Sequence, residues 1–518
     1  MTAETYDVVI IGAGLAGGLL AAEATRRGRR VALIEAGKRF RFADRPAQIR
    51  HRQIFGGLTW PYQHAERDRY TDSSAQSIGV RYALESHRMK GVGGSTLHWG
   101  ARISRLMPTD FRTATLYGQG LDWPLTYDEL EPYYCLADWE LGVSGTAHAS
   151  LPRRSRDYPN PGFPLSADDA AWLPVAERLG HDIYPTAFAI NSRKYGGRSE
   201  CRAFAACEVC PSGARYSADV HVAQAEASGR CDVFSETVAR RIEADSTDAV
   251  RAVHVSTLDH QQREIRGTTY VLAAHAVESA RLLLLSNCGN HSDQVGRNFM
   301  EHVYVRASGQ LPGKRFYPRR IGFEVLESLA YYDGAERRDT GAIKLEFTFE
   351  HDPLADMDRQ QLVGDAAARY DRENFGHWIG MATQTEHVPN PTSRITLDPA
   401  VRDLFGDPVP HVNLAFSDAD LRTQQRSQDI MDQWLTAIGA RNILQAPLSS
   451  NSFGAHHLGT CRMSNDPNAG VVDRDCKVHG LSNLFIAGSS VFPTGGAMQP
   501  SLTVAALTLR MADHLWAA

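Results

Sequence analysis

The chain has 518 residues, of which 43% are hydrophobic and 22% are charged, and its formal net charge is −5 at pH 7. This length exceeds what one hydrophobic core usually serves, so we expect two closely connected domains. The charge balance gives no reason to expect a nucleic-acid partner, and the longest apolar runs, such as 271–276, are too short to span a bilayer. Because Met1 leads almost directly into the first apolar run, we expect no secretory signal on this chain. The expected location is periplasmic if a partner subunit carries the chain outward, and otherwise cytoplasmic.

Residues 6–37 carry the pattern of a dinucleotide-binding strand–helix–strand unit. An apolar run is followed by Gly12-Ala13-Gly14-Leu15-Ala16-Gly17, and a second apolar run ends at Glu35. The three glycines allow a tight turn, close approach of a pyrophosphate, and close packing of helix on strand. Glu35 stands where a carboxylate accepts hydrogen bonds from a ribose hydroxyl, which disfavours NADP and leaves FAD or NAD.

The rest of the chain indicates an interrupted nucleotide-binding fold with a sheet inserted into it. The segment from about 303 to 447 alternates polar and apolar residues, which is typical of an antiparallel sheet with one wet face. Ser417 and Asp420 form a capping-box pattern that predicts a helix continuing to Ile438. Further expected elements are a strand from 232, a strand over 268–274, a helix from about 277, a strand over 483–488 and a helix over 502–514.

Several stretches resemble one family, the glucose–methanol–choline (GMC) oxidoreductases. They are the N-terminal fingerprint, 91–100, 271–279, 293–302 and 456–512. The resemblance implies an α/β fold with a discontinuous Rossmann-like FAD-binding domain and an antiparallel-sheet (α+β) substrate domain. The expected boundaries are 1–302 for the FAD domain with its insertions, including a Cys-rich loop at 195–215, then 303–450 for the substrate sheet, and 451–518 for the return to the FAD domain. The implied reaction is oxidation of an alcohol by hydride transfer to the flavin.

The same resemblance assigns the catalytic pair. The run from Gly454 to Met463 is similar to the family's H-x-x-G-T segment and places His456 as the base that removes the hydroxyl proton, with His457 as the alternative. The family usually has His or Asn before a proline after the last strand, whereas this chain has Gln499 before Pro500. Glutamine offers the same amide donor and acceptor, so Gln499 is expected to help by orienting the substrate oxygen.

The expected FAD contacts come from the fingerprint and from the segments similar to the family. They are Gly12, Gly14, Leu15, Ala16, Gly17, Glu35, Gly93, Gly94, Ser95, His98, Val238, Ala274, Gly488, Ser489, Pro500 and Ser501. His98 lies in a Ser-Thr-Leu-His-Trp run that is similar to the covalent flavin attachment sequence of some sugar oxidases but has leucine where threonine is expected. A packing or flavin-contact role for His98 is therefore preferred, and a covalent link stays an alternative.

Three of the eight cysteines are crowded into ten residues. Cys201, Cys207 and Cys210 are followed by Pro211, and three thiolates would suit a [3Fe–4S] cluster. A disulfide with one free thiol, or a zinc site, remains an alternative. The resemblance to sugar dehydrogenases with a similar insertion favours the cluster, which would carry electrons to a protein acceptor such as a cytochrome subunit. A small chaperone-like subunit is a further expected partner.

The combined pattern is most similar to the sugar dehydrogenases, so a sugar, glycoside or polyol is the expected substrate. His377, Trp378 and Gln384 are candidates for substrate contact. The rival interpretations are an oxidase that makes hydrogen peroxide and has structural cysteines, a non-catalytic subunit that uses its FAD fold as a scaffold, and an NAD-dependent dehydrogenase.

Overall fold

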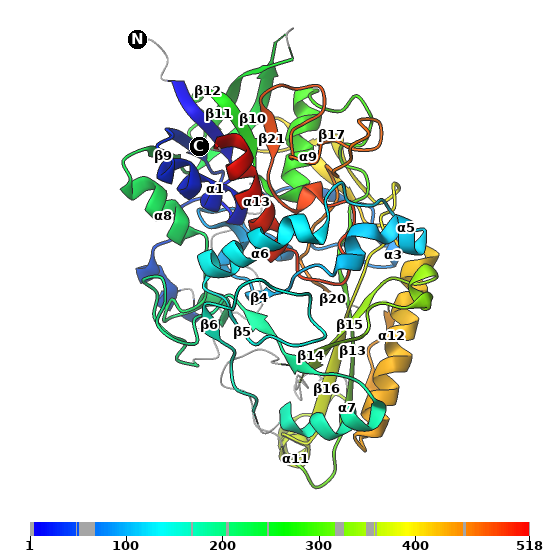
Figure 1. Ribbon diagram of the computed structural model, residues 1–518. Helices are drawn as coiled ribbons and strands as arrows, with labels where there is room; N and C mark the ends of the chain where they lie inside the picture. The colour runs from blue at the N-terminus through cyan, green and yellow to red at the C-terminus, as the bar shows by residue number, and fades with distance from the viewer. Residues whose placement is uncertain are drawn as a thin grey trace.

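A computed structural model describes most of the chain. The described residues are 5–47, 49–50, 68–166, 169–203, 207–245, 248–315, 326–348, 357, 360–448 and 452–516. Figure 1 shows two regions, one around β1, β12 and the helices α1 and α13, and the other around β13 to β16 and α12.

The first region contains a seven-stranded sheet with a parallel core. Its parallel neighbours, in spatial order, are β9 (Cys231–Phe234), β2 (Val31–Ile34), β1 (Thr5–Ile11), β12 (Gln262–Leu272) and β21 (Leu484–Ile486). β10 (Thr237–Ala244) and β11 (Val250–Thr257) extend it as an antiparallel hairpin next to β12. The four residues of β2 are all buried, which is typical of a strand with both faces covered. The first and last segments of the chain thus meet in one sheet, as the discontinuous fold predicts.

Helices cover this parallel sheet. α1 (Leu15–Arg26) follows the glycine turn, and a Cβ atom on Gly17 would lie 1.8 Å from the carbonyl oxygen of Gly12, so only glycine allows this close packing. α8 (Asp219–Ala227) and α13 (Ser501–Trp516) pack against α1, and α6 (Tyr127–Leu141) packs against α13 (Figure 1). α9 (His275–Ser286) begins directly after β12, slightly earlier than predicted.

The second region contains an antiparallel sheet of seven strands. In spatial order they are β19 (Arg441–Gln445), β13 (Val303–Gln310), β16 (Trp378–Thr385), β15 (Ile343–Thr348), β14 (Leu326–Tyr331) and β7 (Tyr184–Pro185), and β20 (Ser452–Phe453) also pairs with β13. The predicted antiparallel sheet is confirmed. Two of its strands, β7 and β20, come from outside the segment 303–450.

One face of this sheet packs on α7 (Leu173–Leu179) and α12 (Asp418–Ala437). Ile343, Leu345 and Phe347 belong to this apolar cluster together with Trp172 and Trp434. Ser417 caps α12 with the predicted reciprocal hydrogen bonds to Asp420.

The opposite face of the sheet corrects one expectation in part, because several of its polar side chains are buried and not exposed to solvent. Lys344 is 0% exposed, Glu346 2% and Gln384 0%. Strand alternation places these side chains on one face, and the FAD region covers them. These polar residues of the alternating pattern therefore belong to the interior and not to the solvent surface.

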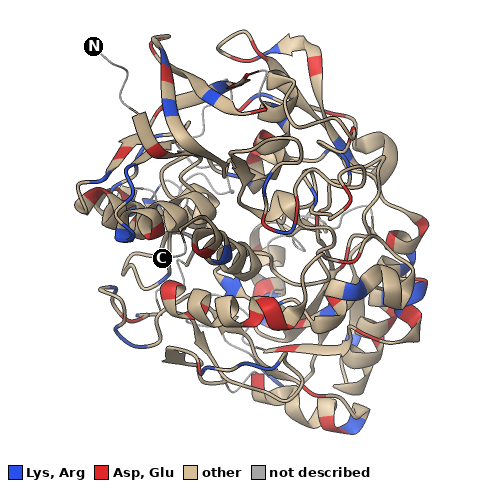
Figure 2. Cartoon of the chain, turned by 45° about the horizontal axis from the view of Figure 1, so that its top comes forward, with Lys and Arg blue, Asp and Glu red and all other residues tan. Residues whose placement is uncertain are grey.

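Smaller elements complete the described structure. Two small sheets contain β17 (Arg394–Arg402), β18 (Pro408–Asn413) and β3 (Thr71–Asp72), and β4 (Arg102–Ile103), β8 (Ala187–Phe188), β5 (Ser144–Gly145) and β6 (Asn160–Pro161). Further α-helices are α3 (Ala75–Ile78), α4 (Leu84–His87), α5 (Thr113–Tyr117) and α11 (Gly364–Asn374). In the described part of the chain, every helix is too short or too polar to cross a bilayer. Figure 2 shows basic and acidic residues interspersed over the elements in view.

Candidate active site and FAD cradle

A cavity of about 790 Å³ lies where the two regions meet. Its walls include the glycine turn after β1, the segment 86–102, the start of α9 and the loops before α13. The polar face of the antiparallel sheet contributes Tyr304, Arg306, Glu346 and Ala382. A single cavity thus adjoins both the nucleotide fingerprint and the inserted sheet.

Most of the predicted FAD contacts line this cavity. They are Gly12, Gly14, Leu15, Ala16, Glu35, Gly94, Ser95, His98, Val238, Ala274, Gly488, Ser489, Pro500 and Ser501. Gly17 and Gly93 are not among the lining residues. Gly17 packs α1 on the sheet, and the amide of Gly93 donates to the carbonyl oxygen of Ala13 over 2.9 Å, which ties the segment 91–97 to the fingerprint turn.

The geometry of the glycine turn suits a bound dinucleotide. A Cβ atom on Gly94 would lie 2.8 Å from the Cα atom of Gly14, so two stretches of bare backbone approach each other at the cavity wall. The carboxylate of Glu35 accepts hydrogen bonds from the amides of Ala13 (3.0 Å) and Gly37 (2.8 Å). Burial raises the pKa of Glu35, and these two bonds oppose that rise. The residues present therefore fit FAD, with exposed backbone for phosphates and a positioned acid at the end of β2.

His456 lies at the centre of the expected chemistry and lines the cavity. Its Nδ1 atom is 2.9 Å from Nδ1 of His302, and its backbone amide donates to the carboxylate of Glu301 over 2.8 Å. Its Nε2 atom makes no hydrogen bond to any described residue. Burial is the main cause that holds the pKa of His456 well below its ordinary value, and the nearby His302 and Lys344 would also disfavour a charged ring, so the ring is neutral at neutral pH.

His457 also reaches the cavity wall, but both of its ring nitrogens are occupied. Nε2 lies 2.6 Å from the hydroxyl of Tyr82, and Nδ1 lies 2.6 Å from Nε2 of His275. The ring is also stacked on Phe299 with 5.7 Å between centroids. His457 therefore has no ring nitrogen left for a substrate in this arrangement, whereas His456 has one.

Gln499 lines the same cavity, and its amide is surrounded by polar groups of the protein. Its oxygen accepts from Lys344 Nζ (2.6 Å) and Ser104 Oγ (2.7 Å). Its nitrogen donates to Gln384 Oε1 (2.8 Å) and Glu346 Oε1 (3.1 Å). An amide has two donors and two acceptor positions, so all four are used.

Sequence reasoning assigned no role to several residues at this site. Arg102 forms an ion pair with Glu346, and both line the cavity. Burial raises the pKa of Glu346, but Arg102 and Lys344 outweigh it and bring that pKa to about 2. The alternation of polar and apolar residues over 343–347 could have drawn attention to two of them, because it places Lys344 and Glu346 on one face of a strand.

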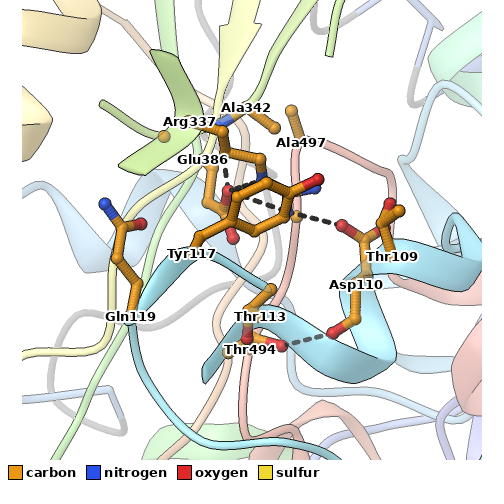
Figure 3. A network of polar contacts seen from close by, with 12 residues as sticks. Thr109, Asp110, Thr113, Tyr117, Gln119, Arg337, Ala342, Glu386, Thr494 and Ala497 are labelled. Atoms are coloured by element: carbon orange, nitrogen blue, oxygen red, sulfur yellow. Dashed lines mark hydrogen bonds and ion pairs between the residues drawn. The ribbon is translucent and has the colours of Figure 1, made fainter. Parts of the chain in front are cut away.

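A buried ionic cluster supports the loop that precedes Gln499 (Figure 3). Arg337 contacts Asp110 over 2.6 Å and Glu386 over 2.9 Å, and Asp110 accepts from the hydroxyl of Tyr332 over 2.8 Å. That hydroxyl in turn accepts from the amide of Ala497 (3.0 Å). Burial raises the pKa of Asp110 to about 6 although Arg337 opposes the rise. The cluster fixes the backbone at 494–497, next to His302 and Gln499.

The candidates for substrate contact in the sheet are placed differently from one another. His377 and Trp378 are not among the residues that line the cavity. His377 bonds instead to the carbonyl oxygen of Lys314 over 2.6 Å. Gln384 is buried behind the cavity wall, bonded to His302 and Gln499.

His98 lines the cavity, where burial lowers its pKa to about 3. This placement agrees with a flavin contact.

The three crowded cysteines carry free thiols, as do the other five. The disulfide alternative is therefore not realised in the structure. Within the described residues, no three His, Cys, Asp or Glu side chains are grouped as metal ligands would be. Residues 204–206, between Cys201 and Cys207, lie outside the described part of the chain. Burial raises the pKa of Cys201, whereas for Cys210 the bonds from Ser212 and from the Arg215 amide, with the Arg215 charge, outweigh burial and lower its pKa.

Comparisons with known proteins agree with this architecture. Two family models described as "GMC oxidoreductase" match residues 165–304 and 389–508, and the "FAD binding domain" model matches 7–48. The chain is 30% identical to the fructose dehydrogenase large subunit of Gluconobacter japonicus over 99% of both chains. It is 27% identical to the 2-methyl-1,2-propanediol dehydrogenase of Mycolicibacterium austroafricanum, covering 99% of this chain and 96% of the relative.

Solved structures share the fold. Pyridoxine 4-oxidase superposes with a TM-score of 0.66 at 21% identity over 98% of both chains. Formate oxidase gives a TM-score of 0.67 at 16% identity, covering 99% of this chain and 98% of that one. Together with the FAD cradle and the cavity beside His456, these matches establish that the chain is an FAD-binding enzyme of the GMC oxidoreductase family, whose members act on CH–OH groups.

Proposed function

We propose that this chain is an FAD-dependent dehydrogenase that oxidises a hydroxyl group of a sugar, glycoside or polyol. One observation carries the proposal: His456, whose Nε2 atom bonds to no described residue, and the FAD fingerprint line the same cavity. A base and a hydride acceptor must both adjoin the substrate carbon, and a shared cavity permits this arrangement.

In the proposed reaction, Nε2 of His456 takes the hydroxyl proton while the C–H bond breaks. FAD, when bound, accepts the hydride, so the substrate loses two electrons and two hydrogens and becomes a carbonyl compound. His456 suits this role because its neutral ring offers a lone pair at neutral pH. His457 is excluded from the proposed role because both of its ring nitrogens are engaged.

The polar wall of the cavity supports a substrate with several hydroxyl groups. Arg102 and Arg306 offer donors, and Glu346 offers carboxylate oxygens, so neighbouring hydroxyls can both donate and accept. Ala382 lies opposite Arg306 and Glu346 in the strand register, and its short side chain leaves room between them. The names of the relatives include a fructose dehydrogenase subunit and a propanediol dehydrogenase, which agree with this substrate class.

We also propose that electrons leave through a [3Fe–4S] cluster bound by Cys201, Cys207 and Cys210. The proposal rests on the sequence spacing and the Cys-Pro ending, since the thiols are not grouped as ligands in the described residues. Such a cluster would supply one-electron transfer to a protein acceptor. A cytochrome subunit and a small chaperone-like subunit are the proposed partners, and the relative named as a large subunit supports an assembly of several chains.

The alternative is an oxidase that reduces oxygen to hydrogen peroxide, and oxidases occur among the relatives, such as paromamine 6′-oxidase of Streptomyces fradiae. Anaerobic mixing of the FAD-loaded protein with fructose, 2-methyl-1,2-propanediol and paromamine tests the proposal. We expect at least one to bleach the flavin, and His456→Gln to slow bleaching by about a hundredfold or more. Rapid oxygen uptake during turnover would instead establish the oxidase.

The cluster is tested separately by iron analysis and electron paramagnetic resonance of anaerobically purified protein. We expect a three-iron signal that disappears in Cys210→Ser and persists in Cys231→Ser, a buried cysteine outside the loop. Iron-free protein that still bleaches with substrate would refute the cluster and leave the dehydrogenase chemistry standing.

A further inference from the structure

A chain of hydrogen bonds runs behind the cavity wall from the antiparallel sheet to the ring of His456. Its members are Lys344, Glu346, Gln499, Gln384, His302 and His456. Hydrogen positions along such a chain depend on one another, because each group that must donate forces its neighbour to accept. The groups at the two ends of the series therefore decide which atom donates in each hydrogen bond.

The first end is the ion pair of Lys344 and Glu346, whose Nζ and Oε1 atoms are 3.1 Å apart. An ammonium group has only donors and an ionised carboxylate has only acceptors. Lys344 therefore holds the oxygen of Gln499 at 2.6 Å, and Glu346 holds its nitrogen at 3.1 Å. The amide of Gln499 can adopt only this orientation without breaking both contacts.

The orientation of the Gln384 amide is fixed by its hydrogen bond with Gln499. The amide nitrogen of Gln499 donates to Gln384 Oε1 over 2.8 Å, and the hydroxyl of Tyr304 donates to the same oxygen over 2.7 Å. The nitrogen of Gln384 then faces Nδ1 of His302 at 3.2 Å. Since this nitrogen can only donate, Nδ1 of His302 must accept.

The hydrogen bond of His302 to Gly496 independently requires Nδ1 of His302 to be the acceptor. Nε2 of His302 lies 2.8 Å from the carbonyl oxygen of Gly496, which can only accept, so Nε2 carries the hydrogen. Burial lowers the pKa of His302 to about 3, so its ring has one hydrogen and Nδ1 is unprotonated. Nδ1 of His456, 2.9 Å away, must therefore be the donor, and it shares the single lone pair of His302 Nδ1 with the more distant nitrogen of Gln384.

We propose that this series of hydrogen bonds fixes the catalytic base in one tautomer, with hydrogen on Nδ1 of His456 and the Nε2 lone pair directed to the cavity. The positioning residues are Lys344, Glu346, Gln499, Gln384 and His302. Gln499 thus acts through its neighbours and not by binding the substrate oxygen, because its amide has no free position. The inference rests on the proposed function, in which His456 removes the substrate proton.

The tautomer is measured directly by NMR of the FAD-loaded protein labelled with ¹⁵N-histidine. Signals of His456 are assigned by their loss in His456→Gln. We expect the wild-type protein to show hydrogen on Nδ1, and His302→Ala to shift the ring towards the Nε2–H form. A purely structural role of His302 would leave the tautomer unchanged.

Kinetics supply the second measurement. We expect His302→Ala and Gln384→Leu to slow anaerobic flavin reduction by about tenfold to a hundredfold, with KM changed by less than about twofold, because the loss falls on proton removal and not on binding. His181→Ala is the matched control, since His181 belongs to the same region but its ring bonds to Tyr331 and stacks on Trp434. Gln384→Leu, which nearly preserves side-chain volume, serves if His302→Ala unfolds.

The outcomes separate this inference from the proposed function. Wild-type His456 with hydrogen on Nε2, or an unchanged tautomer in both variants, would overturn the positioning chain. A His456→Gln variant that bleaches at the wild-type rate would overturn the base assignment, whatever the NMR result. A Gln499→Leu variant with greatly raised KM and unchanged maximal rate would restore Gln499 as a substrate contact.

Discussion

The buried carboxyl group of Glu301 accepts a hydrogen bond of 2.5 Å from the hydroxyl of Tyr82. The same carboxyl group also accepts from the backbone amide of His456, so it joins the segment at His456 to the segment that contains Tyr82. Burial raises the pKa of Glu301 to about 7, although the hydrogen bonds oppose the rise. This relationship gives the protein a specific pH dependence.

We predict that Glu301 makes folding less favourable as the pH rises from about 4.5 to about 7. A carboxyl group whose pKa is raised by folding stabilises the protonated native state, and this contribution is fully present below the unfolded pKa and lost as pH rises through the folded pKa. A tenfold change in proton affinity between the folded and unfolded states corresponds to about 1.4 kcal/mol of stability. Thermal unfolding of the wild-type protein and of Glu301→Gln between pH 5 and pH 8 measures the effect. The variant should lose less stability than the wild type over this range, and parallel profiles would contradict the prediction.

Arg337→Met is predicted to destabilise the protein strongly. The substitution leaves the buried carboxylates of Asp110 and Glu386 without their shared cation, and breaking a buried pair from one side costs about 3–5 kcal/mol. The neighbouring Arg338 is exposed, so Arg338→Met should change stability by less than about 0.5 kcal/mol. Denaturant unfolding of both variants checks the difference. Equal effects would show that the cluster in Figure 3 does not hold the loop.

Gly94→Ala is predicted to weaken FAD binding by about tenfold or more, which corresponds to about 1.4 kcal/mol. Its new methyl group would lie 2.8 Å from the Cα atom of Gly14 and push the two parts of the cradle apart. Gly79→Ala is the matched control, because Gly79 also has a positive φ, of +78°, but among the described residues no atom outside its chain neighbours lies within 4 Å of its Cβ position. Flavin content after dialysis and titration with FAD measure the difference. Similar losses in both variants would attribute the effect to backbone strain alone.

Ser417→Ala is predicted to cost about 1 kcal/mol of stability, the usual effect of removing an N-cap. The hydroxyl of Ser417 accepts from the amide of Asp420 at the start of α12, which packs on the substrate sheet. Ser417→Asp should retain most of the stability because aspartate also caps well. Thermal unfolding of the two variants provides the comparison, and equal losses would show that the cap is not what the helix requires.

The local patterns of the sequence were sufficient for much of the fold. The glycine fingerprint predicted β1, α1 and β2, and the capping box predicted the start of α12. These features are readable because each depends on residues close together in the chain. The pairing of β13 with β19 and β20 could not be predicted, because these strands are far apart in the sequence and meet only in the folded protein.

For the site, the sequence by itself predicted the glycine turn of the FAD cradle, because its residues form a short motif with local backbone requirements, and the resemblance to the GMC family picked out His456 and Gln499 as candidates. Only the tertiary structure decided that Glu346 lines an interior cavity while Lys344 and Gln384 are buried, that His302 meets His456, and that both ring nitrogens of His457 are bonded. The physical reason is that a strand's alternation defines two faces but not what covers them. Burial and hydrogen-bond direction are set by segments more than a hundred residues apart, and these meet only in the folded chain.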